Sequence, residues 1–98
     1  MPDEAVPALR PPTEAEKGAL RSVLGVRVAA ARKRLGLSQR AMARECGMSG
    51  TWARGIELGS QFAPAWLIAM LAEAAGWQVG WFYGFGSRKI AVEESADA

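Results

Sequence analysis

The sequence predicts an all-α fold, a compact domain of five helices. Three observations support this fold class. Apolar residues recur every three or four positions along most of the chain, which is the spacing of helices buried on one face. No segment of useful length alternates apolar and polar residues, as a half-buried strand would. Glycines that could end helices interrupt the apolar pattern at Gly36, Gly47, Gly59 and Gly76.

The first helix is expected to begin at Thr13, because Thr13 and Glu16 have the spacing of a capping box. The helical pattern continues as far as Gly36, which suits the left-handed conformation that commonly ends a helix. The expected buried face consists of Leu20, Val23, Leu24, Val28, Ala31 and Leu35. Two interior glycines, Gly18 and Gly25, each weaken this helix by about 1 kcal/mol relative to alanine.

Two short helices are expected to follow. Ser38 can cap the first of them, over residues 39–46, and Gly47 stops it. Ser49 can cap the next, which stops near Gly59. The residues expected to face the core from these two helices are Met42, Ala43, Cys46, Ala53 and Ile56.

A fourth helix is expected to begin near Pro64, which suits the first turn of a helix, and to end at Gly76. Its expected core face consists of Ile68, Leu71, Ala72 and Ala75. A short fifth helix is expected over residues 79–83. The sequence therefore predicts five helical segments that are separated by short turns.

The chain divides into one domain with two extensions. Residues 1–12 contain four of the five prolines and no helical pattern, so we expect a disordered arm there. Residues 13–86 form the expected folded domain. Residues 87–98 include three acidic residues and are expected to form a flexible acidic tail.

The composition argues against an enzyme and against a metal or cofactor site. The 98 residues include no histidine, which is the usual general base and the commonest metal ligand. The single cysteine, Cys46, cannot form an internal disulfide or a zinc site by itself. No apolar run approaches the ~20 residues that span a membrane. We therefore expect a cytoplasmic protein that is not an enzyme, with no cofactor, no metal and no small-molecule ligand implied.

Basic residues are concentrated in the middle of the chain. The net charge is +2, yet the segment from Lys17 to Arg54 contains nine basic residues and one acidic residue, Glu45. A basic segment of this kind suits binding to a polyanion such as a nucleic acid. A charged surface that only keeps the protein in solution would have the same composition, so charge alone leaves both interpretations open.

The segment from Gln39 to Leu58 has a specific order of small, glycine and apolar positions. Counting from Gln39, the fifth residue is the small Ala43 and the ninth is Gly47, which suits a tight turn between two helices. The apolar positions are Met42, Cys46, Met48, Ala53 and Ile56. We expect them to hold both helices on a shared core. This pattern resembles the helix-turn-helix of phage repressor and Cro proteins, the xenobiotic-response-element type of bacterial regulator.

The flanking segments resemble the same family, so the resemblance covers about residues 23–84. The family's first helix is matched by LGVRVAAARKRLGLSQ, and its fourth and fifth helices are matched by LIAMLAEAAGWQVGWFYG. The resemblance implies that the third helix enters the major groove of DNA and contacts base edges with its first residues. It also implies a buried ion pair between Arg32 and Glu57, which would join the first helix to the third.

The DNA-binding residues that this resemblance implies lie at the start of the second helix and on the third. They are Gln39, Arg40, Ser49, Gly50, Thr51, Trp52, Arg54 and Gly55. Gln39 and Arg40 are expected to contact phosphate, because the N-terminus of a helix favours an anion. Arg54 can bind guanine through two hydrogen bonds, and Thr51 can meet a thymine methyl group.

The third helix departs from the family pattern, because Gly50 and Gly55 have no side chain with which to contact a base. A close backbone approach at these glycines would leave recognition to DNA shape and phosphate contacts. Trp52 fits either a DNA contact or, as is commoner for a large aromatic residue, packing within protein. Arg27 and Arg44 can add phosphate contacts, although solvated positions would explain them as well.

Large apolar residues on the fourth and fifth helices exceed what one small core needs. The fourth helix is apolar on nearly every side, which is typical of a helix that is buried on more than one face. We therefore expect a homodimer interface that contains Trp66, Met70, Trp77 and Trp81. The alternative is that these aromatic residues complete the core of a single chain.

These features together predict a dimeric, sequence-dependent transcriptional regulator. It would be a nucleoid-associated repressor that occupies an operator on double-stranded DNA through the major groove, with no membrane contact. The alternative is a helix-turn-helix protein-interaction module with weak or no base contact, either antitoxin-like or a phage accessory protein.

Overall fold

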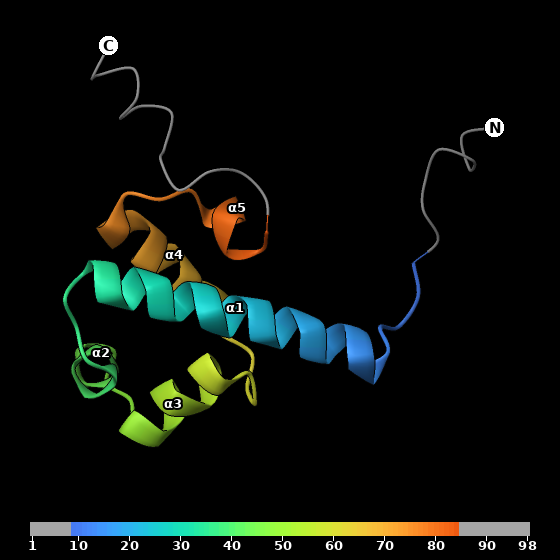
Figure 1. The fold of residues 1–98 in the computed structure, drawn as a ribbon, viewed down its shortest axis with the longest axis horizontal. Coiled ribbons are helices and arrows are strands. Elements are labelled where there is room, and N and C mark those ends of the chain that lie inside the picture. The colour runs from blue at the N-terminus through green and yellow to red at the C-terminus, as the bar shows by residue number, and fades with distance from the viewer. Residues whose placement is uncertain (1–8, 85–98) are drawn as a thin grey trace, which may run out of the picture.

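The computed structural model of the chain describes residues 9–84, and the all-α prediction is confirmed over this range (Figure 1). The five helices are α1 (Glu14–Arg34), α2 (Gln39–Glu45), α3 (Gly50–Leu58), α4 (Ala65–Ala75) and α5 (Val79–Phe82). The acidic tail predicted at residues 87–98, and the first eight residues of the predicted arm, lie outside the described residues.

The long helix α1 lies between two pairs of shorter helices (Figure 1). It contacts α3 on one side and α4 and α5 on the other, while α2 contacts α3 and α4 contacts α5. The N-terminal part of α1 projects beyond the other helices. The helix-turn-helix formed by α2 and α3 therefore has one side against the body of the domain and one side open.

The helices begin where the sequence predicts them to begin. The Thr13 hydroxyl accepts from the Glu16 backbone N–H at 3.1 Å, and the Glu16 carboxylate accepts from the Thr13 N–H at 2.8 Å, which completes the capping box. The Ser38 and Ser49 hydroxyls cap α2 and α3 at 3.0 and 3.1 Å. Gly47 has a φ of +70°, so the turn between α2 and α3 needs the left-handed conformation that glycine adopts freely.

The core gathers residues from all five helices, and most of the predicted inward positions are confirmed. Two predictions for α1 are wrong, because Leu20 and Val23 are exposed. Leu20 lies in the N-terminal part of the helix, which projects past its neighbours, and Val23 lies to the side of the face that buries Leu24. Met48 is also exposed and does not join the shared core. It lies in the turn before α3, where its side chain lines an outer hollow.

The closest approach of α1 and α3 occurs at Gly25, which the sequence suggested only as a weak point of the helix. Gly25 is buried, and a Cβ atom placed on it would lie 2.5 Å from the carbonyl oxygen of Ile56 and 2.8 Å from that of Glu57. Real Cβ atoms do not approach backbone oxygens so closely. The absence of a side chain at Gly25 therefore lets α3 rest directly on the backbone of α1.

Within residues 9–84, no helix has both the length and the apolar character needed to cross a membrane.

Candidate nucleic-acid interface

Helix α3 has a buried face and an exposed face. On the buried face, the side chains of Ala53 and Ile56 are completely buried. The exposed face carries Thr51, Arg54 and Leu58, which recur at the three- and four-residue spacing of one helix side. Thr51 and Arg54, two of the predicted DNA-binding residues, are thus exposed on the outer side of α3. Leu58 was not among the predicted site residues.

A hollow of about 420 Å³ lies between α2 and the start of α3. Its lining residues are Arg40, Arg44, Met48, Gly50 and Thr51. Arg40 and Arg44 are one turn apart on α2, and both are exposed. Among the described residues neither they nor Arg54 have an ion-pair partner, so their charges are available to an anion from outside.

Other basic residues of the middle segment have contacts within the chain. The guanidinium of Arg21 donates from Nε to the Gly59 carbonyl at 3.1 Å. Arg27 donates to the Trp81 carbonyl at 3.0 Å and lies 4.5 Å from the centre of the Trp81 ring. Because α5 is across α1 from the helix-turn-helix, Arg27 is engaged away from that surface.

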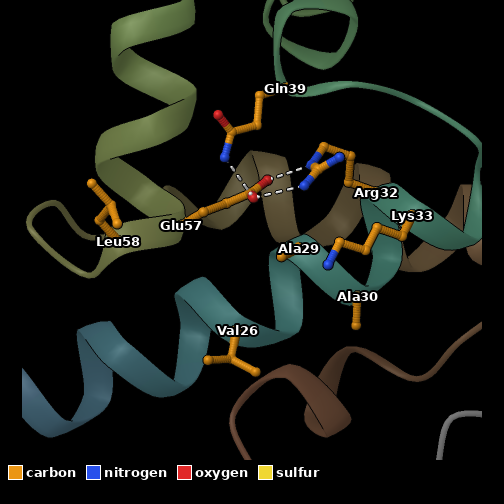
Figure 2. A pocket seen from close by; sticks show the side chains of 8 residues that line it. All are labelled: Val26, Ala29, Ala30, Arg32, Lys33, Gln39, Glu57 and Leu58. Atoms are coloured by element: carbon orange, nitrogen blue, oxygen red, sulfur yellow. Dashed lines mark hydrogen bonds and ion pairs between the residues drawn. The ribbon is translucent and has the colours of Figure 1, made fainter.

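The ion pair between Arg32 and Glu57 is present, as the resemblance implied (Figure 2). Arg32 donates from Nε and Nη2 to the two carboxylate oxygens at 2.6 and 3.0 Å, and from Nη1 to the Leu37 carbonyl at 2.8 Å. The side chains are only 12% and 7% exposed. The hydrogen bonds to Glu57 raise the pKa of Arg32. This pair fixes the end of α3 to α1.

Gln39 joins the same network. Its amide nitrogen donates to Glu57 Oε1 at 2.9 Å, and its amide oxygen has no partner within residues 9–84 (Figure 2). The network forms one wall of a hollow of about 600 Å³, which Val26, Ala29, Ala30, Lys33 and Leu58 also line. Glu57 therefore sets the orientation of the Gln39 amide at the start of α2.

The two glycines of α3 differ from Gly25 in what surrounds them. A Cβ at Gly50 would be 3.7 Å from Arg40 Cγ, an ordinary contact distance. A Cβ at Gly55 would be 2.5 Å from the amide nitrogen of Gln61, the flexible end of an exposed side chain. Among residues 9–84, no backbone atom lies close enough to require glycine at either place. Gln61 was not a predicted site residue, because it lies in the loop after α3.

Trp52 packs against another residue of the chain, which agrees with the protein-packing alternative given for it from the sequence. Its ring is stacked on that of Trp66 from α4, with ring centres 5.9 Å apart and planes within 5° of parallel. Trp52 is partly buried, whereas Trp66 remains 45% exposed. The stack connects α3, beside its exposed face, with the outer side of α4.

The four residues predicted for a dimer interface are not equally accessible. Trp77 belongs to the core and is 8% exposed. Trp81 is partly buried, and its ring meets those of Trp77 and Phe82 edge-on at 4.6 and 5.2 Å. Trp66 and Met70 are 45% and 51% exposed on the outer side of α4. The apolar surface that α4 leaves open therefore centres on Trp66 and Met70.

Comparison with protein families identifies a helix-turn-helix domain over residues 23–83. The chain belongs to this family. The match spans all the elements from the second half of α1 to the end of α5, and it confirms the resemblance that the spacing of residues 39–58 and their flanks predicted. The family is one of DNA-binding helix-turn-helix domains and is compatible with regulators of the repressor type. Comparisons with curated proteins and with solved structures gave no match.

Proposed function

We propose that this helix-turn-helix protein is a dimeric transcriptional regulator that binds duplex DNA with sequence preference and acts as a repressor. The observation that carries this proposal is the charge distribution over α2 and α3. Arg40, Arg44 and Arg54 are exposed and unpaired among the described residues around one open face, while Arg21, Arg27 and Arg32 are engaged within the chain. Three free arginines thus lie where a helix-turn-helix meets DNA.

The residues of this face suit two kinds of contact. Arg40 and Arg44 border the hollow beside α3 and suit the phosphates that flank a groove. Arg54 and Thr51 lie on the exposed side of α3 itself and suit base edges. The free amide oxygen of Gln39 is an acceptor, so a phosphate contact there would use the second hydrogen of its amide nitrogen.

A second copy of the chain is the partner we propose for the outer side of α4. Trp66 and Met70 are four positions apart in α4 and expose large apolar side chains on the same side of the helix. A twofold pair would place two α3 helices on successive turns of the DNA, so that the few base contacts of each are combined. Occupation of an operator by such a dimer is the proposed mechanism of repression.

Selection of bound sequences from a random duplex pool, followed by affinity measurements over a range of salt concentrations, tests DNA binding. Affinity should fall steeply with salt, because phosphate contacts release counterions. Arg40→Ala should weaken binding to all sequences about equally, whereas Arg54→Ala should cost about 1–3 kcal/mol at one preferred base position. Arg10→Ala, which alters the far end of α1, is the matched control. Absence of duplex binding at low salt would favour the protein-interaction module.

Sedimentation of the free protein tests the dimer. Trp66→Ala and Met70→Ala should each raise the dimer dissociation constant by more than about tenfold, as truncation of a central anchor does. Met70→Ala leaves the stack on Trp52 in place, so the two variants separate loss of the interface from disturbance of α3. A wild-type monomer of 10.5 kDa, both free and on DNA, would exclude the dimer.

A further inference from the structure

The loop that follows α3 folds back against the C-terminal end of the helix. Besides the Gly59 N–H that ends α3, the carbonyl oxygen of Gly55 accepts from the backbone N–H of Ser60 at 3.0 Å, from that of Gln61 at 3.3 Å and from the Ser60 hydroxyl at 3.1 Å. Gly59 has a φ of +83°, which allows the chain to reverse at this point. The backbone of Gln61 is thereby held at the C-terminal end of α3.

The other side of this loop is held by α1. Arg21 donates from Nε to the Gly59 carbonyl at 3.1 Å, and its guanidinium lies 5.2 Å from the centre of the Phe62 ring. The residues before and after Gln61 are therefore both anchored. Because the backbone of Gln61 is fixed, its side chain can reach only a limited region, and less conformational entropy is lost when it binds a ligand.

The side chain of Gln61 lies where a side chain on residue 55 would be. A Cβ at Gly55 would be 2.5 Å from Gln61 Nε2, 3.3 Å from Cδ and 3.4 Å from Cγ. The shortest of these distances is about that between two atoms separated by two covalent bonds. The Gln61 amide nitrogen is therefore too close to coexist, without moving, with a Cβ atom on residue 55. Glycine at position 55 thus leaves room for the amide of Gln61.

The amide of Gln61 makes no hydrogen bond within the part of the chain that the structure describes. Gln61 is exposed, and its side chain has no hydrogen-bond partner among residues 9–84, where the printed contacts of this residue are made by its backbone. By contrast, the amide of Gln39 donates to Glu57. A free amide with two donors and one acceptor, placed where a side chain on residue 55 of α3 would be, has the chemistry of a base contact.

We propose that Gln61 is a base-contacting residue that determines specificity, and that it supplies from the loop the side chain that α3 lacks at Gly55. The base class that it suits is adenine, because a glutamine amide pairs with N6 and N7 on the major-groove edge of adenine. This inference rests on the proposed DNA binding and names one contact within it. It also explains why α3 has glycine at position 55, where the family usually has a long polar residue. A larger residue there would displace the Gln61 amide.

The test compares sequences selected from a random duplex pool by wild type, Gln61→Ala and Arg54→Ala. Wild type should prefer adenine at a position that Gln61→Ala no longer distinguishes, with discrimination falling by at least about fivefold. Arg54→Ala should alter a different position, which separates a specific contact from general loosening of α3. Replacement of the preferred adenine by 7-deazaadenine, which lacks the N7 acceptor, should weaken wild type and leave Gln61→Ala unchanged.

Gly55→Ala provides a second, independent route, because the added methyl group requires the Gln61 amide to move. It should reduce preference at the same adenine, and the double variant with Gln61→Ala should be no worse than Gln61→Ala alone. Retention of the wild-type preference by Gln61→Ala would overturn this inference while leaving DNA binding intact. Absence of duplex binding by wild type would overturn the proposed function and this contact with it.

Discussion

The crossing of α1 and α3 and the exposed face of α3 both depend on glycine, but for opposite reasons. At the crossing, a side chain on Gly25 would meet the backbone oxygens of Ile56 and Glu57 at 2.5 and 2.8 Å. On the exposed face, a side chain on Gly55 would meet only the end of the Gln61 side chain, and one on Gly50 would make an ordinary contact. The first glycine is required by the fold. The other two leave space that the fold does not use.

This difference shows how a small domain separates stability from recognition within one short helix. The side of α3 that faces α1 combines backbone contact at Gly25 with the ion pair between Arg32 and Glu57. The opposite side carries free donors on Thr51, Arg54 and, from the loop, Gln61. Substitutions on the first side should change the free energy of unfolding, and substitutions on the second should change binding.

The largest effect on stability is expected from Glu57→Ala. The substitution leaves the guanidinium of Arg32 mostly buried without its carboxylate, and removal of one partner from such a pair is strongly destabilising. We expect the free energy of unfolding to fall by about 3 kcal/mol, as measured by urea denaturation. Glu73→Ala, on the exposed side of α4, is the matched control and should change it by less than about 0.5 kcal/mol. Equal effects of the two variants would contradict the role assigned to the pair.

The next largest effect is expected from Gly25→Ala. The added methyl group must push apart the backbones of α1 and α3, which should cost about 2 kcal/mol even after the higher helix propensity of alanine is counted. Gly18→Ala, in the same helix, is the control, because the nearest atom to its added Cβ would be Arg21 Nη2 at 3.7 Å. It should stabilise the protein by about 0.5–1 kcal/mol. Thermal unfolding followed by circular dichroism measures both, and opposite signs are the expected result.

A smaller change, of opposite sign to that of Gly25→Ala, is expected from Gly55→Ala. The Gln61 side chain can move away at little cost, so the helix propensity of alanine should dominate and stabilise the protein by up to about 1 kcal/mol. Urea denaturation measures this gain. A loss as large as that of Gly25→Ala would show that both faces of α3 are constrained by packing, and the comparison would fail.

The smallest effect concerns pH and the projecting end of α1, which belongs to neither face of α3. The hydrogen bond from Arg10 and, after it, that from the Thr13 backbone lower the pKa of Glu16 from 4.5 to about 2. Because the folded-state pKa is the lower one, the stabilisation is fully present above about pH 4.5 and is lost as the pH falls through about 2. A carboxyl-carbon NMR titration should give a midpoint near 2 for Glu16, and Arg10→Ala should raise it. A midpoint that stays unchanged in that variant would rule out Arg10 as the main cause.

Local signals predicted most of the fold. The capping box at Thr13, the serine caps at Ser38 and Ser49 and the glycine of the turn at Gly47 are all confirmed, because each depends on atoms within a few residues. The ion pair that the resemblance implied is confirmed as well. The wrong assignment of Leu20 has a simple physical reason. Helical spacing shows which side of a helix is apolar, but it does not show where the neighbouring helices end.

The parts of the site that sequence did not predict depend on contacts between distant segments. The approach of Ile56 to Gly25 and the contact of Arg27 with Trp81 join residues that are far apart in the chain. The position of Gln61 over Gly55 depends on a loop conformation that Arg21 and the Gly55 carbonyl fix together. The two glycines of α3 were recognised as unusual from the sequence, but the loop side chain beside Gly55 was not predicted.

The stacked rings of Trp52 and Trp66 give the molecule an optical property. Two indole rings with parallel planes and centres 5.9 Å apart influence each other's ultraviolet transitions, and this coupling changes with their separation. One ring belongs to α3 and the other to the outer side of α4. The near-ultraviolet circular dichroism and the fluorescence of the unlabelled protein will therefore register any movement of α3 against α4. The Trp52–Trp66 stack therefore lies between the surface proposed to bind DNA and the surface proposed to bind a second copy, and its spectrum can be followed without a label.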